Sequence, residues 1–253
     1  MDLGLSERTY VITSSTRGLG FAVARELVAE GARVVVTGRT SETVDKAVVR
    51  LGGEDRVLGV VADNAEAASA ERVIDAALKR FGRLDGALAG AGGPEPGGAT
   101  ELDDEQWRRS FESLFLGTIR LVRTAVSAME EGGALGLVLS GTVREPVAGL
   151  ALSNGLRPGL AMTAKELADE LGPRGIRVFG LLPSQIDTER VLELDSLKGD
   201  PEAVRARNSA AIPLRRYGRA EEFGKVAAFL LSPAASYLTG LMVPVDGGAL
   251  RHI

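Results

Sequence analysis

The feature that most constrains the fold is a repeated switch between strand-like and helix-like apolar patterns. Short apolar runs typical of buried strands lie at residues 10–12, 33–36, 57–61, 84–89, 135–140, 177–182 and 242–245. Between them, apolar residues recur every three or four positions over residues 21–28, 70–81, 110–129 and 221–231, and in a segment that ends near 172–173. Such alternation is typical of parallel strands with helices on both faces, so the sequence predicts an α/β fold.

A glycine-rich turn directly after the first predicted strand separates the two α/β architectures of this size. Residues 13–20 read Thr-Ser-Ser-Thr-Arg-Gly-Leu-Gly. An eight-fold barrel gives no reason for such a turn, whereas a doubly wound sheet places one there to bind a dinucleotide. We therefore predict a single-domain Rossmann fold over residues 1–253, a doubly wound parallel sheet of about seven strands. Residues 189–212 are charged and helix-prone, and we interpret them as a substrate lid or, alternatively, as a plain pair of surface helices.

The composition excludes several kinds of site. The 253 residues include no cysteine and a single histidine, His252, so neither thiol catalysis nor a multi-histidine metal site can be built within one chain. The net charge of −4 and the scattered basic residues argue against binding to nucleic acid. No apolar run reaches the ~18–20 residues of a membrane span, and no targeting segment is evident. We expect a cytoplasmic protein that acts on a small-molecule substrate without a metal.

The glycine-rich turn is predicted to bind a diphosphate. Small residues let backbone N–H groups approach phosphate oxygens at the positive end of the following helix. Gly18 and Gly20 would permit this approach and a tight packing of helix on strand. A purely structural turn is the alternative for so short a motif. The predicted cofactor-binding residues in the turn are Ser14, Ser15, Thr16, Arg17, Gly18, Leu19 and Gly20.

The end of the second predicted strand favours NADP(H) over NAD(H). A fold that prefers NAD places an acidic residue about 20 residues past the loop, where it binds the ribose 2′-hydroxyl. This chain has Arg39 in that region, and a guanidinium binds a 2′-phosphate through two hydrogen bonds. Arg17 would add a second positive contact. The alternative for Arg39 is a solvated surface arginine.

Further segments extend this picture to a family resemblance. They are Ala62-Asp63, Ala89-Gly90-Ala91-Gly92, residues 182–188, and residues 237–240 with 245–248. In this order and spacing, the chain resembles the short-chain dehydrogenase/reductase family over almost its whole length and is similar to 3-oxoacyl-ACP-reductase-like members. The family's loop reads Thr-Gly-x-x-x-Gly-x-Gly, so Ser14 replaces the first glycine. That change is tolerable if Ser14 keeps a negative φ.

The resemblance implies further contacts to the cofactor and between subunits. The residues that it assigns to the cofactor are Asp63 and Asn64 near the adenine, Ala89 and Gly90 at the adenine ribose, and Pro183, Ile186 and Thr188 around the nicotinamide and the diphosphate. Residues 221–231 and 245–248 resemble the family's oligomer interface. We therefore expect a homo-oligomer, either a tetramer or a dimer.

The family's catalytic positions are mostly changed. Its reductases use an Asn–Ser–Tyr–Lys set, in which the tyrosine is the general acid and the lysine lowers the pKa of the phenol. By the family spacing, Ser140 matches the serine, Ser153 the tyrosine and Arg157 the lysine, while Leu114 falls on the asparagine. Three of the four positions therefore differ from the family pattern.

These changes alter the expected proton path. A serine hydroxyl is not a normally titrating group, and an arginine with a pKa above ~12 is a poor proton shuttle. Pro158 follows Arg157, and proline favours the first turn of a helix. We therefore expect a helix to begin near residues 153–157, with Ser153 or Asn154 as its cap, which is the structural alternative for Ser153. The candidate catalytic residues are Ser140, Ser153 and Arg157.

Three functions remain open from the sequence. The first is an NADP(H)-dependent oxidoreductase that acts on a carbonyl or alcohol substrate, with Ser140 and water or the substrate itself on the proton path. The second is a dinucleotide-binding sensor or partner subunit without reductase activity. The third is a non-redox enzyme, such as an isomerase or lyase, that reuses the cleft. We prefer the first because the residues predicted to bind the cofactor are largely intact.

Overall fold

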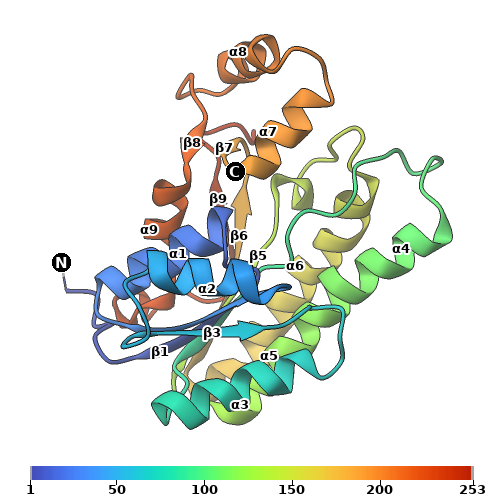
Figure 1. The fold of residues 1–253 in the computed structure, drawn as a ribbon. Helices are drawn as coiled ribbons and strands as arrows, with labels where there is room; N and C mark the ends of the chain where they lie inside the picture. Colours follow the sequence, from blue (N-terminus) through green and yellow to red (C-terminus); the bar gives the residue numbers. More distant parts are fainter. Residues whose placement is uncertain (1, 252–253) are drawn as a thin grey trace.

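Seven parallel strands form the centre of the molecule (Figure 1). The computed structural model describes residues 2–251, so His252 lies outside the described residues. The strands run in the order β3-β2-β1-β4-β5-β6-β9, so the winding direction reverses between β1 and β4. Their bounds are β1 (Thr9–Ile12), β2 (Arg33–Gly38), β3 (Val57–Val61), β4 (Gly86–Ala89), β5 (Gly133–Val138), β6 (Ile176–Pro183) and β9 (Leu241–Val245). This order confirms the predicted Rossmann fold and places its crevice beyond the carboxyl ends of β1 and β4.

Helices cover both faces of the sheet (Figure 1). Those on one face are α1 (Gly18–Ala29), α2 (Ser41–Arg50) and α9 (Ala220–Leu231), and those on the other are α3 (Ser69–Phe81), α5 (Gly117–Ala128) and α6 (Ala151–Leu171). Successive strand side chains point to opposite faces: Val11 packs in one core, and Tyr10 and Ile12 pack in the other. Both faces are therefore apolar, which explains why the strands appear in the sequence as continuous apolar runs.

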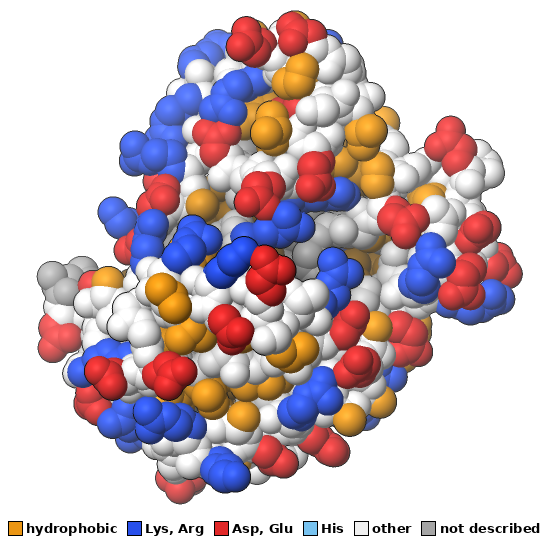
Figure 2. Space-filling model, in the orientation of Figure 1, with side chains coloured by type: hydrophobic (Ala, Val, Ile, Leu, Met, Phe, Trp, Pro, Cys, Tyr) orange, Lys and Arg blue, Asp and Glu red, His pale blue; other side chains and the backbone are white. Residues whose placement is uncertain are grey.

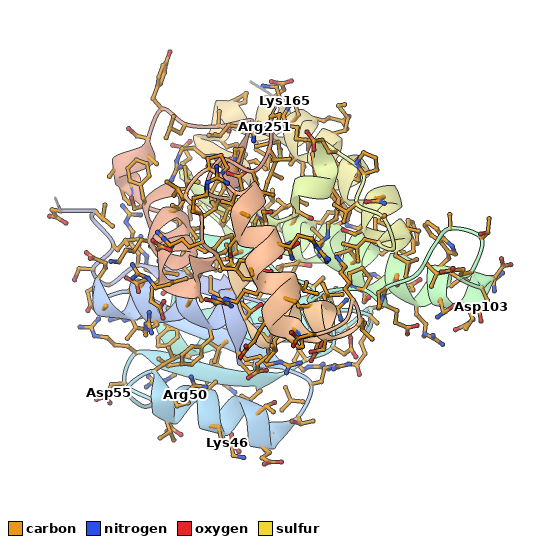
Figure 3. The ribbon with its side chains drawn as sticks, turned by 90° about the horizontal axis from the view of Figure 1, so that it is seen from above. Lys46, Arg50, Asp55, Asp103, Lys165 and Arg251 are labelled. Carbon is orange, nitrogen blue, oxygen red and sulfur yellow. The ribbon has the colours of Figure 1, made fainter. Side chains whose placement is uncertain are left out.

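Two helical segments were absent from the sequence prediction. Helix α2 buries only Val44, Ala47 and Val48, so its apolar stripe is short. Helix α4 (Asp104–Ser110) begins at a capping box, in which Asp103 and Gln106 bind each other's backbone N–H, and it continues through a π-helical turn, η1 (Phe111–Leu116), into α5. Viewed from above, Asp103 lies at one edge of the molecule, and Lys46 and Arg50 of α2 lie at another (Figure 3).

The predicted start of α6 is wrong. The helix begins at Ala151, and its cap residue Leu150 makes no side-chain cap bond. The start is set by the loop after β4, because the N–H of Ala151 donates to the carbonyl of Gly97 in that loop. Ser153 lies inside the first turn, while Asn154 holds the preceding turn through the N–H and carbonyl of Val147. Pro158 therefore lies within the helix, where it cannot donate to the carbonyl four residues earlier.

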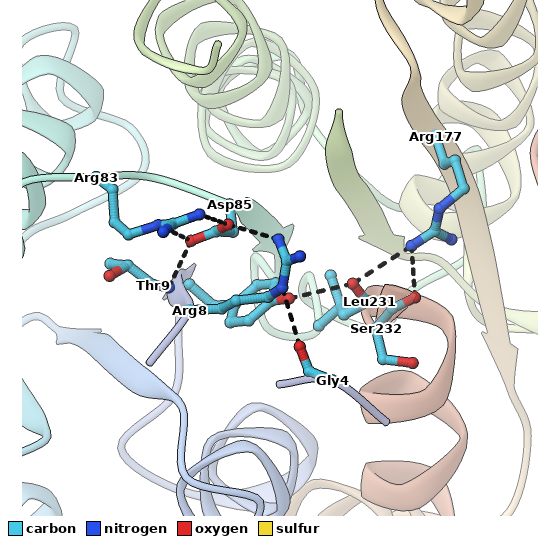
Figure 4. A network of polar contacts seen from close by, with 9 residues as sticks. Gly4, Arg8, Thr9, Arg83, Asp85, Arg177, Leu231 and Ser232 are labelled. Atoms are coloured by element: carbon cyan, nitrogen blue, oxygen red, sulfur yellow. Dashed lines mark hydrogen bonds and ion pairs between the residues drawn. The ribbon is translucent and has the colours of Figure 1, made fainter. Parts of the chain in front are cut away.

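A polar network ties the elements together at the amino ends of the strands (Figure 4). Buried Asp85 accepts hydrogen bonds from Arg8 at 2.7 Å, from Arg83 at 2.6 and 2.8 Å, and from the N–H of Thr9 at 2.9 Å. Arg177 donates to the carbonyls of residues 230–232 at the end of α9. These contacts lie at the end of the sheet opposite the crevice, so they stabilise the fold without occupying the site.

Two helices rise above the carboxyl ends of the strands (Figure 1). They are α7 (Glu189–Ser196) and α8 (Pro201–Ala211), and a short pairing of β7 (Ile186–Asp187) with β8 (Gly218–Arg219) joins their ends. Tyr217 holds them together, because its hydroxyl donates to buried Asp195 at 2.8 Å and accepts from Asn208 at 2.8 Å. Arg205 lies over the Tyr217 ring and pairs with Asp187. The predicted helices are thus present, and their role as a lid stays a prediction. No helix among residues 2–251 is long and apolar enough to span a membrane.

Candidate functional site

The turn between β1 and α1 is held by hydrogen bonds from its own side chains. The Thr13 hydroxyl donates to the carbonyl of Gly90 at 2.7 Å and accepts from its N–H at 2.9 Å. The Ser15 hydroxyl is fully buried, donating to Ile12 and accepting from the N–H of Thr37. Ser15 therefore fixes the loop to β2 through its side chain, and only its backbone is free to face a ligand.

Ser14 adopts a left-handed backbone conformation, with φ at +51°. The negative φ expected for Ser14 is therefore not observed. The loop requires this geometry because two successive N–H groups bind one residue of β2. The N–H of Ser14 donates to the hydroxyl of Thr37 at 3.1 Å, and the N–H of Ser15 donates to the carbonyl of Thr37. A residue with a Cβ pays about 1 kcal/mol or more for such a conformation.

Substitutions at Ser14 should separate backbone strain from side-chain function. We expect Ser14→Gly to keep or raise the melting temperature, because glycine enters the left-handed region without strain. Ser14→Val should cost about 1–3 kcal/mol, because β-branched residues rarely adopt a positive φ. Thermal unfolding of the two variants beside the wild type measures this difference. Equal destabilisation by both would show instead that the serine hydroxyl itself supports the loop.

The amino end of α1 is open to an anion. Arg17 occupies the cap position and makes no side-chain cap bond, so no side chain satisfies the first N–H groups of the helix. The other residues of the turn pack tightly against their neighbours. The methyl group of Thr16 would lie 2.5 Å from a Cβ on Gly38, and Gly20 has no room for a Cβ. Leu19 packs against the apolar core on the α1 face of the sheet. The Arg17 side chain pairs with Glu189 at the start of α7.

Arg39 lies exposed immediately after β2 and has no partner in the part of the chain that the structure describes. Within residues 2–251, no hydrogen bond, ion pair or ring contact engages its guanidinium. Most other arginines of the chain are held by a carboxylate, a carbonyl or a ring. A free guanidinium beyond the second strand, beside the glycine-rich turn, is available to a phosphate group.

The residues predicted at the adenosine end lie together after β3 and β4. Asn64 donates through its amide to the carbonyl of Gly90 at 2.8 Å, and Asp63 accepts from the N–H of Ala65. Ala89 is buried as the last residue of β4, and a Cβ on Gly90 would lie 2.8 Å from the carbonyl of Thr13. These contacts bring the ends of β1, β3 and β4 to one edge, beside the glycine-rich turn.

Ser140 and Ser153 are linked through Thr142, which binds one by its backbone N–H and the other by its hydroxyl. Ser140 follows β5 and accepts from the N–H of Thr142 at 3.2 Å. The Thr142 and Ser153 hydroxyls are buried and lie 3.0 Å apart. Sequence reasoning missed Thr142, for which the only local signal is Ser140 itself, because a serine hydroxyl can accept from the backbone N–H two residues on.

Arg157 lies fully buried beneath the ends of β4 and β5. Its Nη1 donates to the carbonyls of Val138 and Leu139, both at 2.7 Å, and its Nη2 donates to the carbonyl of Gly92 at 3.0 Å. Its Nε has no partner in the described chain, residues 2–251. Burial, reinforced by the charge of Arg190, lowers the pKa of Arg157 to about 10. The guanidinium therefore remains charged at neutral pH and binds the backbone rather than a carboxylate.

Comparison with known proteins identifies the family. A family model described as enoyl-(acyl carrier protein) reductase matches residues 13–249. Dehydrogenase/reductase SDR family member 4 from Bos taurus is 34% identical over 255 residues, which cover 98% of this chain and 89% of that protein. The chain belongs to the short-chain dehydrogenase/reductase family.

Solved structures of this family share the fold. L-Sorbose reductase from Gluconobacter frateurii, complexed with NADPH and L-sorbose, matches with a TM-score of 0.93 at 30% identity, over 100% of both chains. A short-chain dehydrogenase/reductase of the glucose/ribitol dehydrogenase type from Brucella melitensis matches with a TM-score of 0.90 at 29% identity, also over 100% of both chains. The Rossmann architecture and the oxidoreductase family are thus established.

In this short-chain dehydrogenase/reductase, none of the three tyrosines lies at the ends of β4 and β5. Tyr10 is buried in β1 and donates to the carbonyl of Leu231 at the opposite end of the sheet. Tyr217 lies between α7 and α8, and Tyr237 is fully exposed. Burial raises the pKa of both Tyr10 and Tyr217. Leu114, in the π-helical turn, is buried and apolar. No phenol is therefore placed or tuned as an acid at these strand ends.

A second arginine, which sequence reasoning missed, faces the loop after β4. Arg190 on α7 donates to the carbonyl of Pro94 at 2.5 Å, and its Nε lies 2.5 Å from where a Cβ on Gly93 would be. Glu95 in the same loop turns away, because Gln106 and Arg109 bind its carboxylate. Only the residue type of Arg190 could have suggested this contact, since helix α7 brings it over the loop.

The residues predicted near the nicotinamide lie where β6 leads into α7. Pro183 ends β6 and pairs with Val245 of β9, and Ile186 is buried in β7. Thr188 caps α7, accepting from the N–H of Val191, and its methyl group lies 3.8 Å from where a Cβ on Gly18 would be. The start of α7 thus lies against the glycine-rich turn, where Glu189 also pairs with Arg17.

Proposed function

We propose that this short-chain dehydrogenase/reductase is an NADP(H)-dependent oxidoreductase that interconverts a carbonyl and an alcohol on a small-molecule substrate. Arg39 carries the proposal: it is an exposed cation without a partner among residues 2–251, placed where a 2′-phosphate would lie. The solved L-sorbose reductase, to which the chain is similar, is complexed with NADPH.

The residues present fit a dinucleotide. Gly20 leaves no space for a side chain, so backbone can approach a diphosphate, and the first N–H groups of α1 lack a side-chain acceptor. Arg39 and Arg17 would bind the adenosine phosphate and the diphosphate, with Asp63, Asn64, Ala89 and Gly90 around the adenosine and Pro183, Ile186 and Thr188 around the nicotinamide. A bound nicotinamide dinucleotide would supply or accept the hydride.

The catalytic set is proposed to be atypical. Ser140, half-buried at the end of β5, donates a hydrogen bond to the substrate carbonyl oxygen. The charge of Arg157 stabilises the negative charge that develops on that oxygen, because a buried guanidinium acts in a low-dielectric environment. The Ser153 hydroxyl positions Thr142, and the N–H of Thr142 in turn holds the Ser140 hydroxyl. Water or the substrate supplies the proton.

A specific observation also favours a second function, a dinucleotide-binding protein without reductase activity. The residues at the tyrosine and lysine positions are engaged internally, Ser153 with Thr142 and Arg157 with three backbone carbonyls. Such contacts are those of structural residues. The expected homo-oligomer, the lid role of residues 189–212 and the cytoplasmic location stay predictions.

Cofactor preference tests the proposal first. We expect Arg39→Ala to weaken NADPH binding by about 10–100-fold, because a charge-assisted contact is lost, and to change NADH binding by about twofold or less. Titration of each cofactor, followed by the fluorescence of the single tryptophan, Trp107, measures both constants. Arg123→Ala, which removes an exposed arginine from α5, is the matched control and should change neither. Equal loss for both cofactors would contradict the 2′-phosphate assignment.

Turnover separates the two functions. Absorbance at 340 nm is followed with a panel of carbonyl substrates, for the wild type and for a Ser153→Tyr/Arg157→Lys variant. Turnover by the wild type supports the oxidoreductase. Tight NADPH binding with turnover only in the variant supports the binding protein, and absence of NADPH binding contradicts both.

A further inference from the structure

We propose that Arg190 selects substrates that carry a carboxylate, which it binds from the lid while Ser140 receives the reacting carbonyl. The assignment rests on the proposed function, since it names the substrate class of the same cleft. It concerns a residue of α7 that lies outside the glycine-rich turn and outside the positions matched to the family's catalytic set.

The position of Arg190 is set by a long-range contact rather than by its own helix. It occupies the first turn of α7, and its side chain reaches back to the loop after β4, where Nη2 donates to Pro94. The guanidinium rests on Gly93, at a place where any Cβ would lie 2.5 Å from its Nε. The side chain is about one-third exposed, at 34%, so a ligand can reach it from the solvent.

Arg157 lies against the same loop from the core side. Its Nη2 donates to the carbonyl of Gly92, the residue next to the one on which Arg190 rests. The two guanidinium groups therefore bracket residues 92–94. They are close enough that the charge of Arg190 lowers the pKa of Arg157, in addition to the effect of burial.

Among residues 2–251, these two cations have a single carboxylate partner between them. All hydrogen-bond partners of Arg157 in the described chain are neutral carbonyls. The nearby carboxylates are engaged elsewhere, Glu95 with Gln106 and Arg109, and Glu189 with Arg17. Glu193 is the exception, because it accepts a hydrogen bond from Nη1 of Arg190 at 3.5 Å, and its side chain is more than half exposed. A long ion pair at the surface is weak, so an anionic ligand can replace Glu193 on Arg190 while it also faces Arg157, a cation that binds only carbonyls.

Basic side chains also gather on the surface near α7 and α8, with acidic side chains beside them (Figure 2). Lys and Arg side chains gather in a band across the middle of one face, beside a hollow beneath the α7–α8 part of the molecule (Figure 2). Such a band raises the local concentration of anions near the cleft. A guanidinium can donate two parallel N–H groups, the geometry that matches one carboxylate, once the exposed Glu193 is displaced.

Matched ligand pairs test the assignment without turnover. The protein is saturated with NADPH, which does not react with an alcohol, and is titrated by calorimetry with lactate or its neutral amide, lactamide, and with mandelate or mandelamide. We expect each acid to bind at least about tenfold more tightly than its amide, with a preference that falls as salt is added. Arg190→Gln should remove the preference by weakening the acids about 10–100-fold while changing the amides by about twofold or less.

Control variants define what would overturn the assignment. Arg207→Gln removes an exposed arginine from α8 and should leave the preference unchanged. Wild-type protein that binds acids and amides equally, or an Arg190→Gln variant that loses both equally, would overturn the assignment, and the second result would make Arg190 a lid anchor. Loss of NADPH affinity in Arg190→Gln would also overturn it, by making Arg190 a cofactor ligand. If the wild type binds no NADPH, the proposed function fails, and the same titrations of the cofactor-free protein still decide the role of Arg190.

Discussion

Replacing Arg157 by methionine is expected to lower the free energy of unfolding by about 3 kcal/mol, although the substitution removes a buried charge. Two opposing effects decide the sign. Burial of the charged guanidinium costs desolvation free energy, and no carboxylate among residues 2–251 offsets that cost. Against this, the variant leaves the carbonyls of Val138, Leu139 and Gly92 without their donor, at about 1–3 kcal/mol each where water cannot replace it. The three lost bonds should outweigh the relieved penalty.

Urea unfolding of Arg157→Met beside the wild type measures this difference. Arg157→Lys should fall between the two, because an ammonium carries charge and donors but cannot reproduce the planar fork that binds both the end of β5 and the loop after β4. Arg123→Met, on the exposed side of α5, is the control and should change stability by about 0.5 kcal/mol or less. A variant as stable as the wild type would show that desolvation cancels the hydrogen bonds. Arg157 would then be retained for its charge in the cleft.

Gly20→Val is expected to abolish measurable dinucleotide binding, with an affinity loss of about 100-fold or more, and to destabilise the fold by about 1–3 kcal/mol. A Cβ at this position would lie 2.6 Å from the carbonyl oxygen of Ser14 and 2.9 Å from the Cα of Ser15. Both atoms belong to the backbone, so no side-chain rotation can relieve the contact. The loop must move away from α1, and the phosphate-binding N–H groups move with it.

Titration of NADPH together with thermal unfolding separates the two effects. Gly172→Ala is a matched control, because a Cβ there meets no atom within 4 Å and the residue has an ordinary helical φ of −53°. It should leave both binding and stability within error of the wild type. If Gly20→Val were destabilised but bound NADPH normally, the glycine would serve packing of α1 on β1 alone.

The sequence by itself determined the architecture and indicated where a cofactor is expected. Alternating apolar patterns specify strands and helices locally, and the turn between Thr13 and Gly20 marks the end of the sheet at which a Rossmann fold binds its ligand. The place of Arg39 directly after β2 was predictable for the same reason, because it follows a short, regular strand, while its contact with a cofactor stays a prediction. Helix α2 was not predicted, because it buries only three of its ten residues and its apolar stripe is therefore short.

Only the tertiary structure decided how the remaining site residues are used. The left-handed backbone of Ser14 results from hydrogen bonds to Thr37 on the neighbouring strand. The bonds of Arg157 to β5 and to the loop after β4, and the contact of Arg190 with Pro94, join residues separated by up to 96 positions along the chain. Local sequence patterns record propensity and burial, whereas these contacts depend on which strand ends and loops the sheet topology brings together. The chemistry of this cleft is therefore set by long-range packing around a loop of glycine and proline.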